Sequence, residues 1–233
     1  MDQDVVQALF SAFIVVAIML LVGFPVHEAL HAWTAMKLGD NTARWMGRVS
    51  LDPRVHFDQI GGLILAATAI LNALEVFNLL FGYAKPTPVN PMNMRYGRQG
   101  HALVAFAGPA SNLVVAVIVA IPLRIVLSND DLIRFVFFEN RLAELFFDVG
   151  ELLLRLNILL FIFNLIPIPP LDGWAVLKGI VPTQFARQLE DLEFRYANVI
   201  PMLFFGVLLV IWVGGGGFLG TFIYGIRDFL LGI

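Results

Sequence analysis

The chain alternates long uncharged stretches with short polar ones. No charged residue occurs from Val5 to Val26, and none lies between Arg98 and Arg124. A third apolar run covers Leu152–Leu171, and Tyr196–Ile226 is an uncharged region that Gly214–Gly217 divides into two short arms. Each of the first two runs exceeds the roughly 20 residues that a helix needs to cross a hydrocarbon core. The pattern predicts an all-α polytopic membrane protein with about five to six membrane helices.

Composition agrees with a membrane location. Of the 233 residues, 59% are hydrophobic and 14% charged, and the mean hydropathy is +0.82, far above a soluble domain. The net charge of −3 comes without a basic run, so no nucleic-acid partner is expected. The absence of cysteine excludes disulfides, thiolate zinc sites and a cysteine nucleophile. The N-terminal MDQDVVQALF lacks the positive region of a signal peptide, so the first apolar run is expected to be retained.

The polar segments between the runs predict irregular structure near one membrane surface. Gly39–Gln59 has Gly and Pro punctuation and a strand-like run at Arg44–Leu51, which favours an interfacial loop or short β-hairpin. Residues 82–98 contain three prolines and predict extended or turn structure. The polar segments before and after the apolar Ile60–Phe81 are expected to lie on the same side of the membrane. Ile60–Phe81 is therefore not expected to cross the membrane once, but to be a re-entrant or interfacial element that acts as a movable gate.

One segment carries recognisable chemistry. Gly23–Leu38 reads GFPVHEALHAWTAMKL, and in a helix His27 and His31 share a face one turn apart, with Glu28 beside them. Two imidazoles at this spacing can bind one Zn²⁺ while the carboxylate takes a proton from water, as in H-E-x-x-H peptidases. The alternative is a pair of helix histidines with ordinary partners. Pro25 predicts a kink or loosening around Leu21–Pro25.

Two later motifs are less specific when each is taken alone. Ala107–Asn112 reads AGPASN, and Asn112 fits an interhelical hydrogen bond as well as a substrate contact. Asn164–Trp174 reads NLIPIPPLDGW, in which Asp172 before Gly173 suits a turn or a helix N-cap.

Together, in this order, the motifs HEALH, AGPASN and NLIPIPPLDG resemble those of the site-2 protease family of intramembrane zinc metalloproteases. Phe81–Pro91, FGYAKPTPVNP, is similar to a stretch of one prokaryotic branch. The resemblance implies that His27, His31 and Asp172 hold one Zn²⁺ per chain. It also implies that Glu28 is the general base and that Asn112 and Asn164 bind substrate.

The resemblance further implies a function and a location. The expected activity is metal-dependent cleavage of transmembrane segments, so the expected partners are a transmembrane protein substrate and the lipid bilayer. No segment has the length or polarity of a PDZ or CBS domain, and residues 1–233 are expected to form a single membrane-embedded domain. Basic residues flank the catalytic side, which predicts an active site near the cytoplasmic side of a prokaryotic cytoplasmic membrane.

Three other functions fit parts of the sequence. A metal-binding transporter would carry further intramembrane carboxylates or histidines, yet past Ala102 the spans offer only Asp172 in their interiors. A catalytically inactive scaffold of the same fold stays open. A di-iron hydroxylase needs more than the four histidines present, of which His56 and His101 are expected to be interfacial polar residues.

Overall fold

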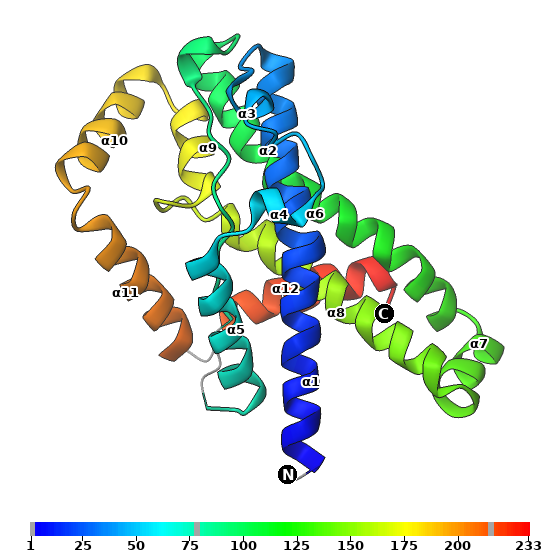
Figure 1. Cartoon of the computed structure of the whole chain (residues 1–233). Coiled ribbons are helices and arrows are strands. Elements are labelled where there is room, and N and C mark those ends of the chain that lie inside the picture. Colours follow the sequence, from blue (N-terminus) through cyan, green and yellow to red (C-terminus); the bar gives the residue numbers. More distant parts are fainter. Residues whose placement is uncertain (1–2, 77–79, 214–216) are drawn as a thin grey trace.

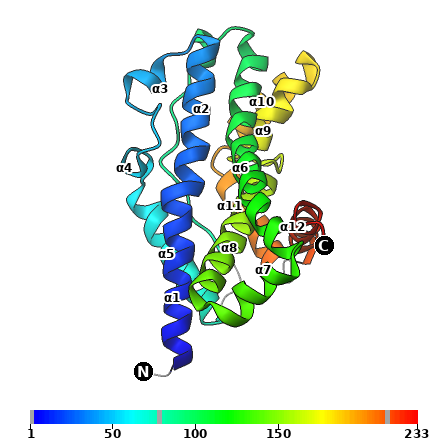
Figure 2. The same cartoon turned by 90° about the vertical axis from the view of Figure 1, so that its right-hand side faces the viewer.

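The structure is a bundle of helices built around one long central helix. The computed structural model describes residues 3–76, 80–213 and 217–233, and every regular element in these ranges is a helix. The central helix is α6 (Gly97–Leu127), which packs against α2 (Phe24–Leu38), α8 (Arg141–Asn164) and α9 (Asp172–Ile180) (Figures 1 and 2). The all-α prediction is confirmed.

The first apolar run forms an interrupted helix. α1 (Gln3–Ile18) leads into a π-helical turn, η1 (Met19–Gly23), and then into α2. Pro25 has no N–H to offer the preceding turn, and the N–H of Phe24 donates to the carbonyl of Met19. This π-helical turn directly precedes Pro25, so the loosening predicted around Leu21–Pro25 is confirmed.

Two very short helices, α3 (Thr42–Trp45) and α4 (Pro53–His56), occupy the region between α2 and the next apolar segment. No strand occurs in the described ranges, so the prediction of short β-hairpins near the site is wrong for them. Side chains rather than a β-ladder hold this region. The guanidinium of Arg48, only 3% exposed, donates to the carbonyls of Val55 and Lys85.

The segment predicted to re-enter the membrane doubles back on itself. α5 (Gln59–Ala73) runs beside α1, and the return segment, residues 80–90, runs back alongside α5 in an extended conformation (Figure 1). The Thr68 hydroxyl donates to the carbonyl of Phe81 and accepts from its N–H, and the N–H of Lys85 donates to the carbonyl of His56. The segment therefore starts and ends at the same end of the bundle. Residues 77–79 lie outside the described ranges, and the position of this hairpin in a membrane stays a prediction.

The remaining helices are η2 (Pro91–Asn93), α7 (Asp130–Arg134), η3 (Phe135–Glu139), α10 (Thr183–Arg195), α11 (Ile200–Val213) and α12 (Gly217–Leu231). Among them, α12 packs against α6 and α8, whereas α10 contacts α9. Small side chains of α6, Ala116 and Ala120, let α8 approach closely, and Leu154 and Ile158 of α8 are fully buried there. Of the break predicted at Gly214–Gly217, only Gly217 is described.

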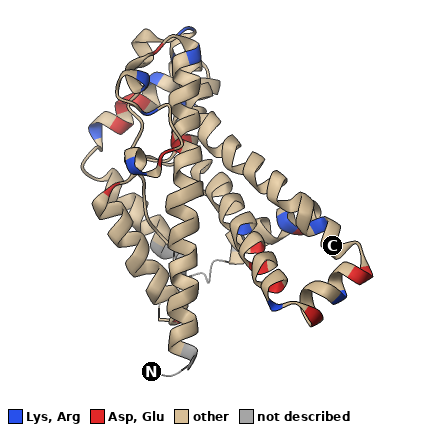
Figure 3. Cartoon of the chain, turned by 45° about the vertical axis from the view of Figure 1, so that its right-hand side comes forward, with Lys and Arg blue, Asp and Glu red and all other residues tan. Residues whose placement is uncertain are grey.

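Two helices of the described part are long and apolar enough to cross a membrane. They are Val5–Leu38, with 34 residues, and Gly97–Leu127, with 31 residues. The predicted count of five to six spans is not supported, because the other helices are shorter or, like α8, carry several charges. Figure 3 shows that charged residues gather mainly towards the two ends of the bundle.

Candidate metal centre

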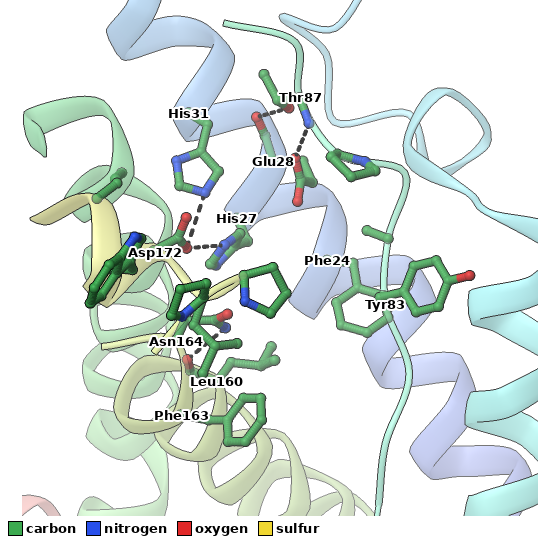
Figure 4. Close-up of a pocket in the computed structure, with 18 of the residues that line it drawn as sticks. Phe24, His27, Glu28, His31, Tyr83, Thr87, Leu160, Phe163, Asn164 and Asp172 are labelled. Atoms are coloured by element: carbon green, nitrogen blue, oxygen red, sulfur yellow. Dashed lines mark hydrogen bonds and ion pairs between the residues drawn. The ribbon is translucent and has the colours of Figure 1, made fainter. Parts of the chain in front are cut away.

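Two imidazoles and one carboxylate meet where α2, α6 and α9 come together. His27 and His31 project from α2 one turn apart, and each is only 7% exposed. Asp172, the first residue of α9, places Oδ2 3.0 Å from His27 Nε2 and 3.3 Å from His31 Nε2 (Figure 4). The structure therefore brings together the three residues that the family resemblance implied as metal ligands.

The second nitrogen of each imidazole is held by an oxygen. His27 Nδ1 lies 2.7 Å from Asn112 Oδ1, and His31 Nδ1 lies 2.7 Å from the main-chain oxygen of Val104. Since an amide oxygen accepts but cannot donate, each Nδ1 must carry the proton. When these rings are neutral, Nε2 is the nitrogen left free to bind an ion on the side of Asp172, the arrangement that histidine adopts as a metal ligand.

The donor set fits zinc in number, type and spacing. A tetrahedral ion with bonds of about 2.0–2.2 Å places its ligand atoms about 3.3–3.6 Å apart. The two distances from Asp172 Oδ2, 3.0 and 3.3 Å, lie close to that edge length. Two neutral imidazoles and one carboxylate are among the sets that leave a fourth position free for chemistry in zinc hydrolases.

Gly108 of α6 forms the floor under the two imidazoles. A Cβ at this position would lie 2.3 Å from His31 Nε2 and 2.7 Å from His27 Nε2. The helix can come this close to both rings only because residue 108 has no side chain.

Glu28 is a second carboxylate within reach of the imidazoles. Ligand atoms of His27, Glu28 and His31 all lie within 4.8 Å of one another, so Glu28 competes with Asp172 for the role of third ligand. However, Glu28 Oε2 already accepts a 2.8 Å hydrogen bond from the N–H of Thr87, whereas Asp172 directs one oxygen at both Nε2 atoms. The geometry therefore favours Asp172 as ligand and places Glu28 beside the ion position.

The site opens into a cavity of about 550 Å³. Its wall includes the two imidazoles, Glu28, Asp172 and the extended return segment, together with Asn164 from the end of α8 (Figure 4). The side-chain nitrogen of Asn164 donates to the carbonyl of Leu160. The predicted role of Asn164 in substrate binding stays a prediction. His101 also borders this cavity, whereas His56 is buried away from it and contacts the carbonyl of Ser50.

Asn112 lies behind the site rather than in the cavity. It is fully buried, its oxygen accepts from His27, and its nitrogen donates to the carbonyl of Gly23 and to Asn157 Oδ1. The structure thus shows the interhelical hydrogen bond, and protein atoms surround the amide. The predicted role of Asn112 in substrate binding stays a prediction.

Sequence reasoning missed two polar residues next to the site. Asn157 of α8 is fully buried and links Asn112 to the carbonyl of Leu153. A lone amide within an apolar run was the signal that could have revealed it. Thr87, which holds Glu28, carried no such signal.

Comparison with known proteins places this chain in a family. No family model and no solved structure matches the chain. A Bacillus subtilis protein named "Putative zinc metalloprotease YwhC" is 32% identical over 188 residues, which cover 81% of this chain and 78% of that protein. The chain belongs to this family of zinc metalloproteases.

Mycobacterial proteins extend the family. "Putative zinc metalloprotease Rip2" of Mycobacterium tuberculosis is 29% identical over 207 residues, covering 87% of this chain and 71% of that protein. Rip2 of Mycolicibacterium smegmatis is 30% identical over 183 residues, covering 78% and 63%. These relatives, with the group formed by His27, Glu28 and His31, confirm the predicted zinc cofactor. The branch without PDZ or CBS domains stays a prediction.

Proposed function

We propose that this protein is an intramembrane zinc metalloendopeptidase of the site-2 protease type, which cleaves transmembrane segments of other membrane proteins. The observation that carries the proposal is the convergence of His27, His31 and Asp172 with Glu28 at hand. This group lies towards one end of a 34-residue apolar helix. Ionisable groups in such a place are costly without a function.

Each polar residue of the site has a distinct task. His27, His31 and Asp172 would hold the ion, and Asn112 and Val104 keep both Nε2 lone pairs directed at it. Bound zinc supplies Lewis acidity, which polarises the scissile carbonyl and lowers the pKa of water. Glu28 takes the proton from the attacking water and passes it to the departing amine. The new carbon–oxygen bond forms first, and the carbon–nitrogen bond then breaks as the amine receives the proton from Glu28.

The membrane position follows from the distance along α2. Six to ten residues separate the two histidines from Lys37, which corresponds to about 9–15 Å along a helix. The site would therefore lie inside the bilayer close to the side that carries most Lys and Arg, which we take as cytoplasmic. A substrate helix must unwind before attack because a helix engages its carbonyls, and the cavity wall offers Asn164 as a partner for an unwound backbone.

The decisive comparison is between wild type and Glu28→Gln in liposomes that contain a labelled transmembrane peptide. Wild type is expected to cut within the membrane segment. Glu28→Gln is expected to keep its zinc and to lose about 10²–10⁴-fold in rate, the usual contribution of a general base. Equal cleavage by the two proteins contradicts the role of Glu28. Zinc-loaded wild type that cleaves no peptide supports the inactive scaffold, and zinc flux across the liposome supports the transporter.

A further inference from the structure

The return segment presents a single isolated N–H opposite the site. Pro86 and Pro88 have no N–H, so Thr87 provides the only main-chain donor in residues 86–88. A residue that precedes proline is restricted to extended conformations, which holds Lys85 and Thr87 extended. The sequence Pro-Thr-Pro therefore fixes the direction of one donor in advance.

That donor is directed at Glu28. The N–H of Thr87 donates to Glu28 Oε2 over 2.8 Å, and the hydroxyl of Thr87 donates to the main-chain oxygen of Glu28 over 3.1 Å (Figure 4). A hydrogen bond to a carboxylate is about twice as strong as one between neutral groups. One carboxylate oxygen is thus held, which leaves the other for proton transfer.

Buried charged side chains anchor the segment on both sides of Thr87. On one side, the Arg48 guanidinium donates to the carbonyl of Lys85 over 3.2 Å, while the N–H of Lys85 donates to His56. On the other side, the N–H of Asn90 donates to Asp40 Oδ2 over 2.6 Å. Arg48 and Asp40 are 3% and 0% exposed. Buried charges are retained only where they are well hydrogen-bonded, so the position of the Thr87 donor is firmly set.

We propose that the main-chain N–H of Thr87 is a positioning group, which holds the Glu28 carboxylate in the orientation for proton transfer and away from the ion. This inference rests on the function proposed above. Without the tether, Glu28 is close enough to the imidazoles to become a further ligand, since its oxygen lies within 4.8 Å of their ligand atoms. A ligating Glu28 cannot act as a base.

Two substitutions distinguish the effect of the main-chain N–H of Thr87 from the effect of its side chain. Thr87→Pro deletes the donor in a segment that proline already keeps extended, and Thr87→Val keeps the donor but deletes the hydroxyl. In the liposome assay, Thr87→Pro is expected to lower kcat about tenfold to hundredfold, the usual range for a hydrogen bond to a charged group. KM should stay within about twofold, zinc should stay at one per chain, and kcat of Thr87→Val should exceed that of Thr87→Pro at least about tenfold.

A double-mutant cycle tests whether the effect passes through Glu28. Glu28→Asp shortens the side chain by one methylene, so its carboxylate no longer reaches Thr87. In that background Thr87→Pro is expected to cost less than about threefold. The same fold-loss in both backgrounds indicates a general disturbance of the segment and overturns the proposal.

A second readout does not depend on cleavage. In the cobalt-substituted protein, Thr87→Pro is expected to change the visible absorption bands as Glu28 joins the ligands. Adding Glu28→Gln should restore the wild-type bands, and Thr87→Val should leave them in place. Identical bands in wild type and Thr87→Pro overturn the positioning role. If the bands change as expected but wild type cleaves no peptide, the positioning role stands and the proposed peptidase function fails.

Discussion

Replacing Gly108 by alanine adds one methyl group directly beneath the two imidazoles. The new Cβ would lie 2.3 Å from His31 Nε2, whereas non-bonded carbon contacts settle near 3.5–4.0 Å. His31 would therefore have to retreat by about 1 Å, several times the roughly 0.2 Å within which metal–ligand distances are held. The ring cannot simply rotate away, because its Nδ1 is bound to the carbonyl of Val104 at 2.7 Å.

The expected consequence is a loss of zinc affinity with little loss of folding. Changes that only reorient a ligand cost about 10–100-fold in metal affinity, and displacing two ligand atoms at once should cost about 100-fold or more. In a helix interior, alanine is favoured over glycine by about 1 kcal/mol, whereas overpacking a buried site costs about 1–3 kcal/mol. The melting temperature of the zinc-free protein should therefore fall only slightly while zinc affinity falls steeply, which separates damage at the site from damage to α6.

The assay is competition for zinc between the purified protein and a chromophoric chelator. Gly225→Ala in α12 is the matched control, because a Cβ there would have no heavy atom within 4 Å. It should bind zinc as wild type does. Zinc affinity of Gly108→Ala within about threefold of wild type would refute the packing of α6 against the imidazoles and the placement of the ion.

Four further outcomes are expected. Asn112→Leu should weaken zinc binding about 10–100-fold by freeing His27 Nδ1, measured with the same chelator. Asn157→Leu should have a smaller effect in the same direction, because Asn157 acts on His27 only through Asn112. Removal of zinc with a chelator should abolish peptide cleavage, and added zinc should restore it. Burial opposes ionisation of Asp40, yet hydrogen bonds from Asn90 and Thr42 hold its pKa below the usual value. The charged carboxylate therefore stabilises the fold above pH about 3.9, and this contribution is lost as the pH falls further. The difference in melting temperature between wild type and Asp40→Asn should accordingly be largest near pH 7 and should disappear below pH about 4.

Local patterns predicted the first half of the site well. The spacing of His27 and His31 places them on one helical face wherever the helix goes, and Pro25 predicts the loosened turn before them, found as η1. Asp172 is different. It lies 145 residues from His27 in sequence, and by local rules it was a turn or cap residue. Only the family resemblance connected it to the histidines.

The strand prediction failed for a physical reason. Arg44–Leu51 was predicted as a strand-like run, but it finds no ladder partner in the described ranges. The return segment is extended, as predicted for residues 82–98. Single hydrogen bonds to buried side chains replace the ladder, as with Arg48 and Asp40. Such long-range partners depend on how the whole chain packs, and the same holds for Thr87, whose role depends on its position opposite Glu28.

The amount of zinc bound by Asp172→Asn tests the proposed metal centre most directly. Asparagine keeps the size of the side chain but removes the charged oxygen that both imidazoles face. Wild type and Asp172→Asn would be purified separately in parallel, dialysed against the same zinc buffer and analysed by atomic emission. One zinc is expected per wild-type chain, and little or none in the variant. Full zinc content and unchanged zinc affinity in Asp172→Asn would contradict the proposed metal centre.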